Sequence, residues 1–352
     1  MLGLDQFRPP HAFGSSHGHS RIIREAYFED TAYVPLVQRA YELWKDLEKV
    51  SGRKMFSQTG GLMIGNPEGV LVSGAIRSAR EHHLQHRILS AAEVRKAYPV
   101  LHPAEDMIGV FEPRAGILFP EAIIEAHLAL AQEKGASVFF DEPVLEWEPQ
   151  GEAVRVITKR NTFAANKLLI TAGAWVKTLL QDLALPLSIE RQVMFWFAPR
   201  SVPQKFKPEN CPVHLWEYSP GRFFYGLPAL GHAIKVAIHH EGEITEPDKL
   251  RDDVSEGDME SMRKLLASFI PDANGQLKTA MVCKYTNAPD GHFLFDFHPK
   301  HKQALIASPC SGHGFKFSSV IGELAATLLN GQIPPFDLRL FNIKRFGSSA
   351  DK

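Results

Sequence analysis

The sequence predicts a mixed α/β fold into which an antiparallel sheet is inserted as a second domain. Helical and strand-like hydrophobic periods alternate along most of the chain, with no internal repeat and no low-complexity linker, which indicates an α/β layer. Residues 189–240 differ, because short apolar runs follow one another there with only turn residues between them, as in an antiparallel meander. The chain has 352 residues, 44% of them hydrophobic, so it can bury a large core in two closely joined domains.

Helices are predicted where apolar side chains recur at helical spacing. Residues 33–51 carry this pattern and are followed by Gly52, a common residue just after a helix. Ser90 and Glu93 form a capping box at the start of a second helix, which Pro99 closes. Further helices are expected near residues 120–134, near residues 259–269, and from the segment "SGHGFKFSS" onward.

Strands are predicted from short apolar or alternating runs bounded by turn residues. The run "LLIT" has the unbroken apolar character of a buried parallel strand. The other expected strands before the meander are "ASVFF", "VLEWEP" and "AVRVITK". The meander itself consists of "IERQVMFWFAP", "PVHLWEY", "RFFYGLP" and "AIKVAIHH", and more strands are expected around Cys283, Phe293 and Leu305.

Charge and cysteine content narrow the function classes. The 39 basic residues nearly balance the 40 acidic ones without a long run of one sign, so we expect a small-molecule partner and neither nucleic acid nor a membrane surface. Cys211, Cys283 and Cys310 are odd in number and lack C-x-x-C spacing, which argues against a disulfide framework and suits a reducing compartment. The apolar runs are too short to cross a bilayer, and the first ten residues do not read as a signal peptide. The predicted location is cytoplasmic.

The segment "FGSSHGHSRIIREAY" is a first candidate binding loop. Arg21 and Arg24 are three residues apart, so on a helical turn both guanidiniums would project from one side and hold an anion. An ordinary polar loop is the alternative, and this stretch alone favours it. His17 and His19 form an H-x-H pair with no nearby carboxylate, so no metal site is expected.

Two further segments carry candidate charged groups. In "SGHGFKFSS", Gly312 and Gly314 would expose backbone N–H groups at a helix start beside Lys316, which outlines an anion site, although a turn built only for backbone geometry is an equal alternative. In "GHAIKVAIHH", Lys235 and His239 share one face of a strand, where Lys235 is either a snorkelling edge residue or a buried cation. Spacing alone slightly favours the edge residue.

Taken together, "SSHGHSRIIREAY", "VCKYTNAPDGHF" and "SGHGFKFSS" resemble the monomeric sarcosine oxidase and N-methyl-L-tryptophan oxidase family, FAD-dependent amine oxidases of the D-amino-acid-oxidase superfamily. The similarity runs from Leu4 to about Phe346. It implies an oxidase that transfers hydride from a secondary amino acid to FAD and is reoxidised by O2, giving H2O2. The implied substrate is a small secondary amine with a carboxylate, and the implied enzyme is a monomer.

The resemblance also implies roles for single residues. Cys283 would bind FAD covalently, Tyr285 would line the substrate cavity, and His239 would lie near the substrate amine. Lys235 would act through water when O2 reoxidises the flavin. Arg24 and Lys316 would clamp the substrate carboxylate and so orient the reacting C–H bond. The remaining FAD contacts would come from Asp5, Ser15, His17, Ser20, Arg21, Gly173, Gly312, His313, Gly314, Phe315 and Lys316.

The implied fold is a Rossmann-like FAD-binding domain with an inserted substrate domain. The FAD-binding domain would comprise residues 1–60, 135–185 and 278–346, and the substrate domain residues 61–134 and 186–277. The family begins with a strand, a G-x-G-x-x-G turn and a helix, which this sequence lacks, so we expect an N-terminally truncated enzyme sequence. The alternative is a truncated, non-catalytic flavin-family binding module. Two smaller departures are Phe224, which would bear on substrate choice, and Cys310, a rival thiol near the flavin.

Overall fold

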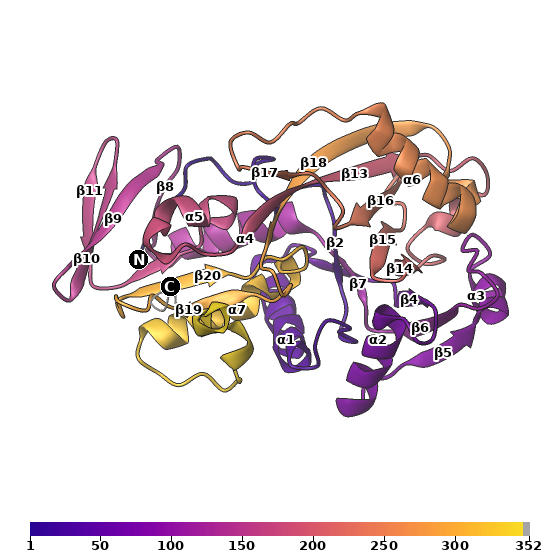
Figure 1. The fold of residues 1–352 in the computed structure, drawn as a ribbon, viewed down its shortest axis with the longest axis horizontal. Coiled ribbons are helices and arrows are strands. Elements are labelled where there is room, and N and C mark those ends of the chain that lie inside the picture. The colour runs from indigo at the N-terminus through magenta and orange to yellow at the C-terminus, as the bar shows by residue number, and fades with distance from the viewer. Residues whose placement is uncertain (348–352) are drawn as a thin grey trace.

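The structure is a computed structural model and describes residues 1–347. Its elements form two parts joined along the middle of the molecule (Figure 1). One part contains both chain termini and several small sheets, and the other is built on one large sheet with α2, α3 and α6 beside it. Within the described residues, no helix has the length and apolar character needed to cross a bilayer.

The first part holds three small sheets. Two of them contain the parallel pairs β1 with β8 and β12 with β20, which confirms the parallel strand predicted at "LLIT". The strands of this part are β1 (Leu2–Leu4), β8 (Ser137–Phe139), β9 (Val144–Gln150), β10 (Ala153–Thr158), β11 (Thr162–Ala165), β12 (Leu168–Ile170), β19 (Leu294–Phe297) and β20 (Ala304–Ser308).

The large sheet confirms the last three strands of the predicted meander, whereas the first, β13, does not pair with β14. Strands β14, β15 and β16 are successive antiparallel neighbours, and β13 pairs with β16. The sheet is mixed, because β14 also pairs in parallel with β4. Its strands are β4 (Gly61–Gly65), β5 (Arg87–Ser90), β6 (Ile108–Glu112), β13 (Ser188–Phe197), β14 (Val213–Ser219), β15 (Arg222–Leu227), β16 (Ile234–His239), β17 (Ile244–Thr245) and β18 (Leu277–Asn287).

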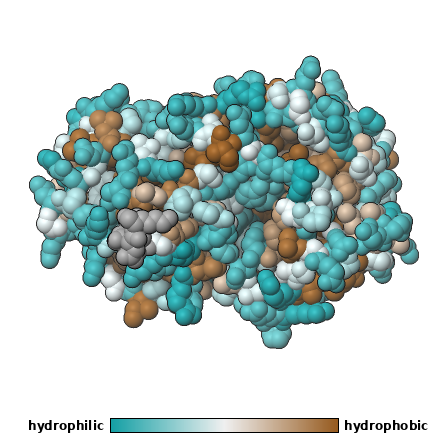
Figure 2. Space-filling view, in the orientation of Figure 1, coloured by the Kyte–Doolittle hydropathy of each residue, from teal (hydrophilic) through white to brown (hydrophobic). Residues whose placement is uncertain are grey.

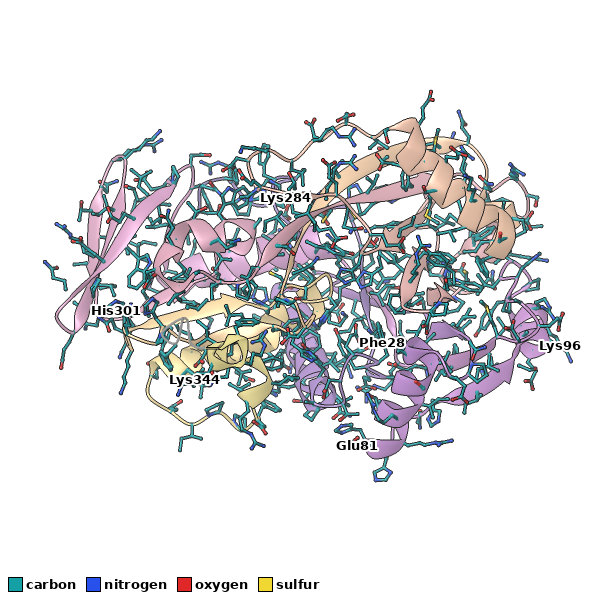
Figure 3. The ribbon with its side chains drawn as sticks, viewed as in Figure 1. Phe28, Glu81, Lys96, Lys284, His301 and Lys344 are labelled. Atoms are coloured by element: carbon teal, nitrogen blue, oxygen red, sulfur yellow. The ribbon has the colours of Figure 1, made fainter. Side chains whose placement is uncertain are left out.

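Strand β18 crosses from one part to the other. We expected residues 278–346 to belong with the FAD-binding part, yet β18 pairs with β13 of the large sheet from Ser188 opposite Asn287 to Phe197 opposite Leu277. Its labelled residue Lys284 lies near the junction of the two parts (Figure 3). Because one strand belongs to the large sheet and leads into the other part, residues near Cys283 are held between the two.

A third group of strands corrects one expectation about Arg21 and Arg24. Strands β2 (Arg21–Ile23), β7 (Gly116–Leu118) and β3 (Phe56–Gln58) form an antiparallel sheet. The two arginines therefore lie on and just after a strand, and the helical turn considered above does not form. The β-branched pair Ile22 and Ile23 favours a strand, and the backbone pairs with β7.

The helices follow the predicted positions closely. Helix α1 ends at Gly52, whose φ of 66° and N–H bond to the Glu48 carbonyl close it, and the capping box of Ser90 with Glu93 is present. The helix α2 was not predicted. The helices are α1 (Tyr33–Ser51), α2 (Val70–Glu81), α3 (Ala91–Ala97), α4 (Pro120–Glu133), α5 (Val176–Leu179), α6 (Glu256–Phe269) and α7 (Ser318–Leu329).

Two large apolar clusters form most of the core. One joins α1, α4 and α7 around the fully buried Trp44, and the other lies between the large sheet and α6 around Trp216. On the face drawn in Figure 2, hydrophilic side chains cover most of the surface and apolar ones form small scattered groups. Such scattered apolar residues are ordinary for a folded protein.

Candidate active site

A cavity of about 1750 Å³ lies where the two parts meet. It is larger than the roughly 300–1,000 Å³ typical of a pocket for one small ligand. Its wall brings together residues from the chain's beginning, middle and end. The sequence-predicted residues in the wall are Asp5, Ser15, Ser20, Arg21, Arg24, Gly173, Lys235, His239, Cys283, Tyr285, Gly312, His313, Gly314, Phe315 and Lys316.

His17 is the exception among the site residues predicted from sequence, since it is not in the cavity wall formed by residues 1–347. Its Nε2 lies 2.9 Å from the carbonyl oxygen of Val282, and its Nδ1 is buried without a hydrogen-bond partner. Burial, with help from Arg21, lowers the pKa of His17 to about 4, so the ring is neutral. In the structure His17 attaches the loop to β18.

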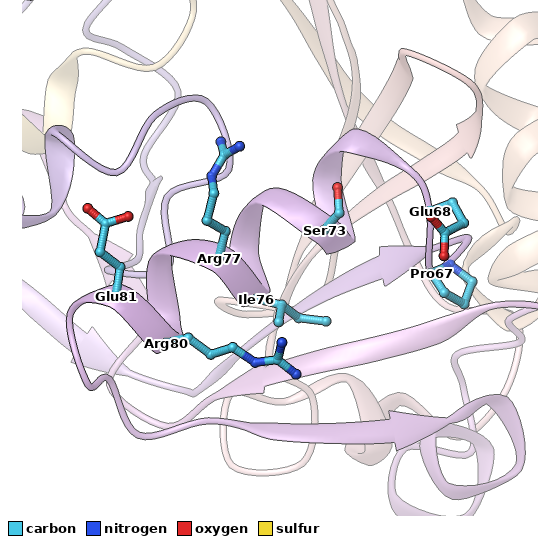
Figure 4. A pocket seen from close by; sticks show the side chains of 7 residues that line it. All are labelled: Pro67, Glu68, Ser73, Ile76, Arg77, Arg80 and Glu81. Carbon is cyan, nitrogen blue, oxygen red and sulfur yellow. The ribbon is translucent and has the colours of Figure 1, made fainter.

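A second, smaller hollow carries none of the predicted site residues. It has a volume of about 510 Å³ and lies along α2, with Arg77, Arg80 and Glu81 extending from the helix (Figure 4). These three side chains are exposed. The chemistry predicted from sequence therefore gathers in the large cavity.

Arg24 and Lys316 converge at one aromatic ring. The Arg24 guanidinium carbon lies 4.2 Å from the centre of the Tyr27 ring, and Lys316 Nζ lies 5.2 Å from the same centre. Lys316 Nζ also donates a hydrogen bond to Tyr27 Oη at 3.2 Å. Tyr27 is fully buried and thus places two cations side by side at the cavity wall.

Arg24 is paired with a carboxylate of the chain itself. Its Nη2 donates to both oxygens of Glu29 at 2.7 Å, and its Nη1 donates to the Ala26 carbonyl oxygen at 2.9 Å. Burial opposes the charge on Glu29, but Arg24 outweighs it and lowers the pKa of this carboxyl. Glu29, which also lines the cavity, is thus an anion beside the predicted clamp.

Lys316 is buried and titrates near neutrality. Its Nζ donates to the His313 carbonyl oxygen at 2.7 Å as well as to Tyr27. Burial, followed by repulsion from Arg24, lowers the pKa of Lys316 to about 7. An anion bound beside it would favour the charged ammonium.

Lys235 is the buried cation and not the edge residue that spacing slightly favoured. It is 2% exposed, and its Nζ donates to the carbonyl oxygens of Gly18 and Ser20 at 3.0 and 2.8 Å. Burial and the charge of Arg21 lower the pKa of Lys235 well below its ordinary range. A longer contact of 3.5 Å joins the same Nζ to the Ser20 hydroxyl oxygen.

His239 and Tyr285 form a pair in the same wall. His239 Nδ1 lies 3.1 Å from Tyr285 Oη. Burial, with repulsion from His240, lowers the pKa of His239 well below its usual value, and burial raises the pKa of Tyr285 well above its own. Both side chains are therefore neutral at neutral pH.

At Gly312, the loop after β20 lies close against the rings of His239 and Tyr285. Its φ is +75°, and a Cβ at this position would lie 2.7 Å from the Tyr285 ring and 2.9 Å from the His239 ring. Only glycine adopts this conformation readily and leaves that space open. At Gly314 a Cβ would meet the Pro309 carbonyl oxygen at 1.4 Å, so this glycine too is required by close backbone approach.

Comparisons with known proteins indicate the family of this chain. The family model described as FAD dependent oxidoreductase matches residues 2–328. The chain is 41% identical to the monomeric sarcosine oxidase of Streptomyces avermitilis, over 99% of this chain and 92% of the relative. It is 32% identical to the N-methyl-L-tryptophan oxidase of Yersinia pestis, over 98% of this chain and 92% of the relative.

The chain belongs to the FAD-dependent oxidoreductase family. Solved structures agree at the level of the fold. NikD, an amino acid oxidase essential for nikkomycin biosynthesis, matches with a TM-score of 0.83 at 19% identity, over 97% of this chain and 90% of NikD. Glycine oxidase from Geobacillus kaustophilus matches with a TM-score of 0.78 at 18% identity, over 98% of this chain and 91% of that structure.

The residues of this FAD-dependent oxidoreductase fit its cofactor. The cavity is larger than one small substrate needs, and Gly312 and Gly314 keep part of its wall free of side chains. Cys283 is 3% exposed and lies in the cavity wall on β18, packed with Met194 and Ala237. Among residues 1–347, no group of three or more histidine, cysteine or acidic side chains is placed to hold a metal ion.

The second thiol, Cys310, also lines the cavity of this FAD-dependent oxidoreductase. Burial raises the pKa of Cys310, although hydrogen bonds with Ser308 and Thr286 oppose the shift. It lies on the loop between β20 and Gly312. Both thiols are free. They differ in position, since Cys283 lies on the strand β18 and Cys310 on a loop.

Sequence reasoning missed three residues of this site and misjudged one. Phe224 was expected to bear on substrate choice, but it is fully buried and stacks on Trp216 in the second core cluster. Its neighbour Tyr225 lines the cavity instead, because adjacent residues of β15 face opposite sides of the sheet. Strand alternation could have shown this. Tyr27 and Glu29 carried no local signal, since their roles depend on contacts with Lys316 and Arg24.

Proposed function

We propose that this FAD-dependent oxidoreductase is an oxidase of secondary amino acids of the sarcosine or N-methyl amino acid type. The observation that carries the proposal is the buried pair of cations, Arg24 and Lys316, at a cavity whose wall also holds Cys283, Lys235 and His239. The relatives named as monomeric sarcosine oxidase and N-methyl-L-tryptophan oxidase support it, since they align over nearly the whole chain.

The two cations would bind and orient the substrate. The bonds of Arg24 to Glu29 and Ala26 use three N–H groups, which leaves Nε–H and one Nη1–H for a substrate carboxylate. Lys316 would contribute a second charged donor beside it. Holding the carboxylate at two points fixes the direction in which the amine and its C–H bond extend, which lowers the entropic part of the barrier.

His239 would meet the amine end of the substrate. Its Nδ1 is occupied by Tyr285, so its Nε2 remains for the amine nitrogen. A neutral imidazole can accept a hydrogen bond from the substrate N–H at this atom and so hold the nitrogen in a fixed place. The depressed pKa of His239 keeps it in the neutral form.

Bound FAD would supply the hydride acceptor for the substrate carbon, and its reoxidation by O2 would give H2O2. In the reoxidation by O2, the residue of this chain that would assist is Lys235. Its Nζ, held at the cavity wall by Gly18 and Ser20, would stabilise negative charge developing on oxygen through a direct or water-mediated hydrogen bond. We further propose that Cys283 attaches FAD covalently, since its thiol is held by a rigid strand of the cavity wall.

Oxygen uptake by flavin-loaded protein tests the proposal. The substrates are sarcosine, N-methyl-L-tryptophan and L-pipecolate, and N-methylbenzylamine is the probe that lacks a carboxylate. We expect uptake and peroxide with at least one amino acid. Arg24→Ala should raise KM for that amino acid and leave the slow reaction of N-methylbenzylamine unchanged. No uptake with any of the three amino acids would overturn the proposal and favour a binding module.

We also propose that the protein is monomeric and cytoplasmic. The name of the Streptomyces relative describes that protein as monomeric. Cys211, Cys283 and Cys310 are all free thiols, as suits a reducing compartment. Light scattering of the purified protein tests the first proposal, and a mass near twice 39.3 kDa would contradict it.

A further inference from the structure

A buried carboxylate lies on the strand next to Tyr285, the partner of His239 in the cavity wall. Glu190 is 4% exposed and sits on β13 opposite Tyr285 of β18. It is not one of the residues that line the cavity within the described chain. The mechanism proposed above therefore leaves this buried charge without a role.

The Glu190 carboxylate is surrounded by hydrogen-bond donors. Its Oε1 accepts from Gln192 Nε2 at 2.7 Å and from the Gly242 N–H at 2.6 Å. Its Oε2 accepts a short hydrogen bond from Asn287 Nδ2 and lies 3.3 Å from His240 Nδ1. Burial alone would favour the neutral acid, but these donors, led by His240 and Gly242, lower the pKa of Glu190. The group is thus an anion that organises four partners.

Two of these partners belong to a turn that needs support. His240 and Glu241 have φ values of 58° and 89°, in the left-handed region that non-glycine residues seldom occupy. Gly242 follows, and a Cβ there would lie 1.7 Å from the Arg191 carbonyl oxygen. Such a backbone is costly and persists only where the surroundings hold it. Glu190 holds this turn at both of its ends, through His240 and Gly242.

The turn begins at the residue after His239. The rings of His239 and His240 have centroids 4.2 Å apart, and the His240 ring lies 5.3 Å from that of Tyr285. A shift of His240 would therefore move both members of the pair in the cavity wall. Displacements of about 1 Å at a reacting centre can lower a rate by roughly a hundredfold.

We propose that Glu190 is a positioning residue that holds His239 and Tyr285 in their working geometry through His240 and the turn ending at Gly242. It touches neither the cavity nor the reacting atoms, and it acts on the rate through the orientation of the His239 and Tyr285 rings. The inference rests on the proposed oxidase function for its kinetic part only.

The test compares Glu190→Gln with Glu241→Gln. The first variant keeps the size of the side chain but replaces one acceptor oxygen by an NH2 group that faces donors. The second removes a carboxylate from the same turn, where it bonds Tyr218 and Arg222 on the exposed side. For Glu190→Gln with sarcosine we expect a fall in kcat of about tenfold or more, with KM changed by less than about threefold, because the carboxylate clamp lies on other elements. Glu241→Gln should match the wild type.

A double variant tests whether the kcat lost in Glu190→Gln can be restored. In Glu190→Gln with Asn287→Asp, one hydrogen of the new NH2 group can go to the new carboxylate at 287 and the other to His240 Nδ1, which then accepts. The oxygen of residue 190 still accepts from Gly242. We expect kcat to return to within roughly threefold of the wild type, which loss of fold stability alone would not predict. A kcat for Glu190→Gln equal to the wild type, or an equal loss in Glu241→Gln, would overturn the proposal.

Hydrogen exchange of the purified protein, measured without substrate, separates this inference from the proposed function. The Gly242 N–H donates to the charged carboxylate of Glu190, and Glu190→Gln leaves it only a neutral amide oxygen, a weaker acceptor. Exchange at Gly242 should therefore speed up in Glu190→Gln and stay unchanged in Glu241→Gln. If the wild type oxidises none of the amino acids, the proposed function fails while the exchange result still decides whether Glu190 holds the turn. Unchanged exchange at Gly242 in Glu190→Gln would contradict the positioning role.

Discussion

The Arg24 guanidinium donates both Nη2 hydrogen bonds to Glu29, one to each carboxylate oxygen at 2.7 Å. The carboxylate that pairs with the predicted substrate clamp is thus built into the chain, five residues after Arg24. It compensates the buried charge while no substrate is bound, and it competes with the substrate for the same cation. Both effects can be measured.

We expect Glu29→Gln to change substrate binding and stability in opposite directions. KM for sarcosine should fall, because one competitor for Arg24 is removed. The free energy of unfolding should fall by about 3–5 kcal/mol, since a buried guanidinium loses its partner. Steady-state kinetics and chemical denaturation measure the two effects.

The matched control for Glu29 is Glu323→Gln. Glu323 also pairs with an arginine, Arg39, but at the surface. It should leave KM unchanged and cost no more than about 1 kcal/mol. A raised KM in Glu29→Gln would show that Glu29 assists the clamp and does not compete with the substrate.

Substrate binding should weaken as the pH rises through about 7. The pKa of Lys316 in the substrate-free protein is about 7, so the attractive ammonium form is present below this pH and is lost above it. KM for sarcosine, measured between about pH 6 and 9, should therefore rise with pH. Lys316→Met should raise KM most at the acidic end and flatten the profile. A profile that Lys316→Met leaves unchanged would assign the titration to another group.

FAD should be attached at Cys283 and not at Cys310. Cys283 lies within the long strand β18, whereas Cys310 lies on the loop that leads to Gly312. In acid-precipitated, flavin-loaded protein, the yellow colour should be lost in Cys283→Ala and retained in Cys310→Ala. Mass spectrometry of a tryptic digest locates the adduct. A flavin mass on the Cys310 peptide would reverse the assignment.

Gly312→Ala should abolish oxidase activity. The added Cβ would meet the rings of Tyr285 and His239, and the φ of +75° adds a backbone strain of roughly 1–3 kcal/mol. Gly331→Ala is the control, because Gly331 has a φ of +73° and no atom within 4 Å of an added Cβ. Both variants should lose stability in thermal unfolding through the positive φ, Gly312→Ala more because its Cβ also meets two rings, and only Gly312→Ala should lose oxygen uptake. Equal activity in the two would place Gly312 outside the working site.

Local sequence signals predicted much of the secondary structure. Helix α1 with its end at Gly52, the capping box of Ser90 with Glu93, and the shared strand face of Lys235 and His239 all depend on residues close in the chain. Helix α2 was missed although its buried residues Leu71, Ala75 and Ala79 recur at helical spacing. Its N-cap, Gly69, provides no side-chain cap, and the helix contains Gly74. Its stability comes from packing, since Gly74 lies close against the backbone of Phe28.

The sequence by itself determined the family, the mixed α/β fold and the candidate residues of the cavity wall, because motifs and hydrophobic periods are properties of neighbouring residues. Only the tertiary structure decided how those residues are partnered. The pairing of Arg24 with Glu29, the place of Tyr27 between two cations, and the anchoring of the His240 turn by Glu190 join groups whose contacts depend on the folded backbone. Burial then sets their charge, since the pKa of Lys316 or His239 depends on surroundings that no single segment contains.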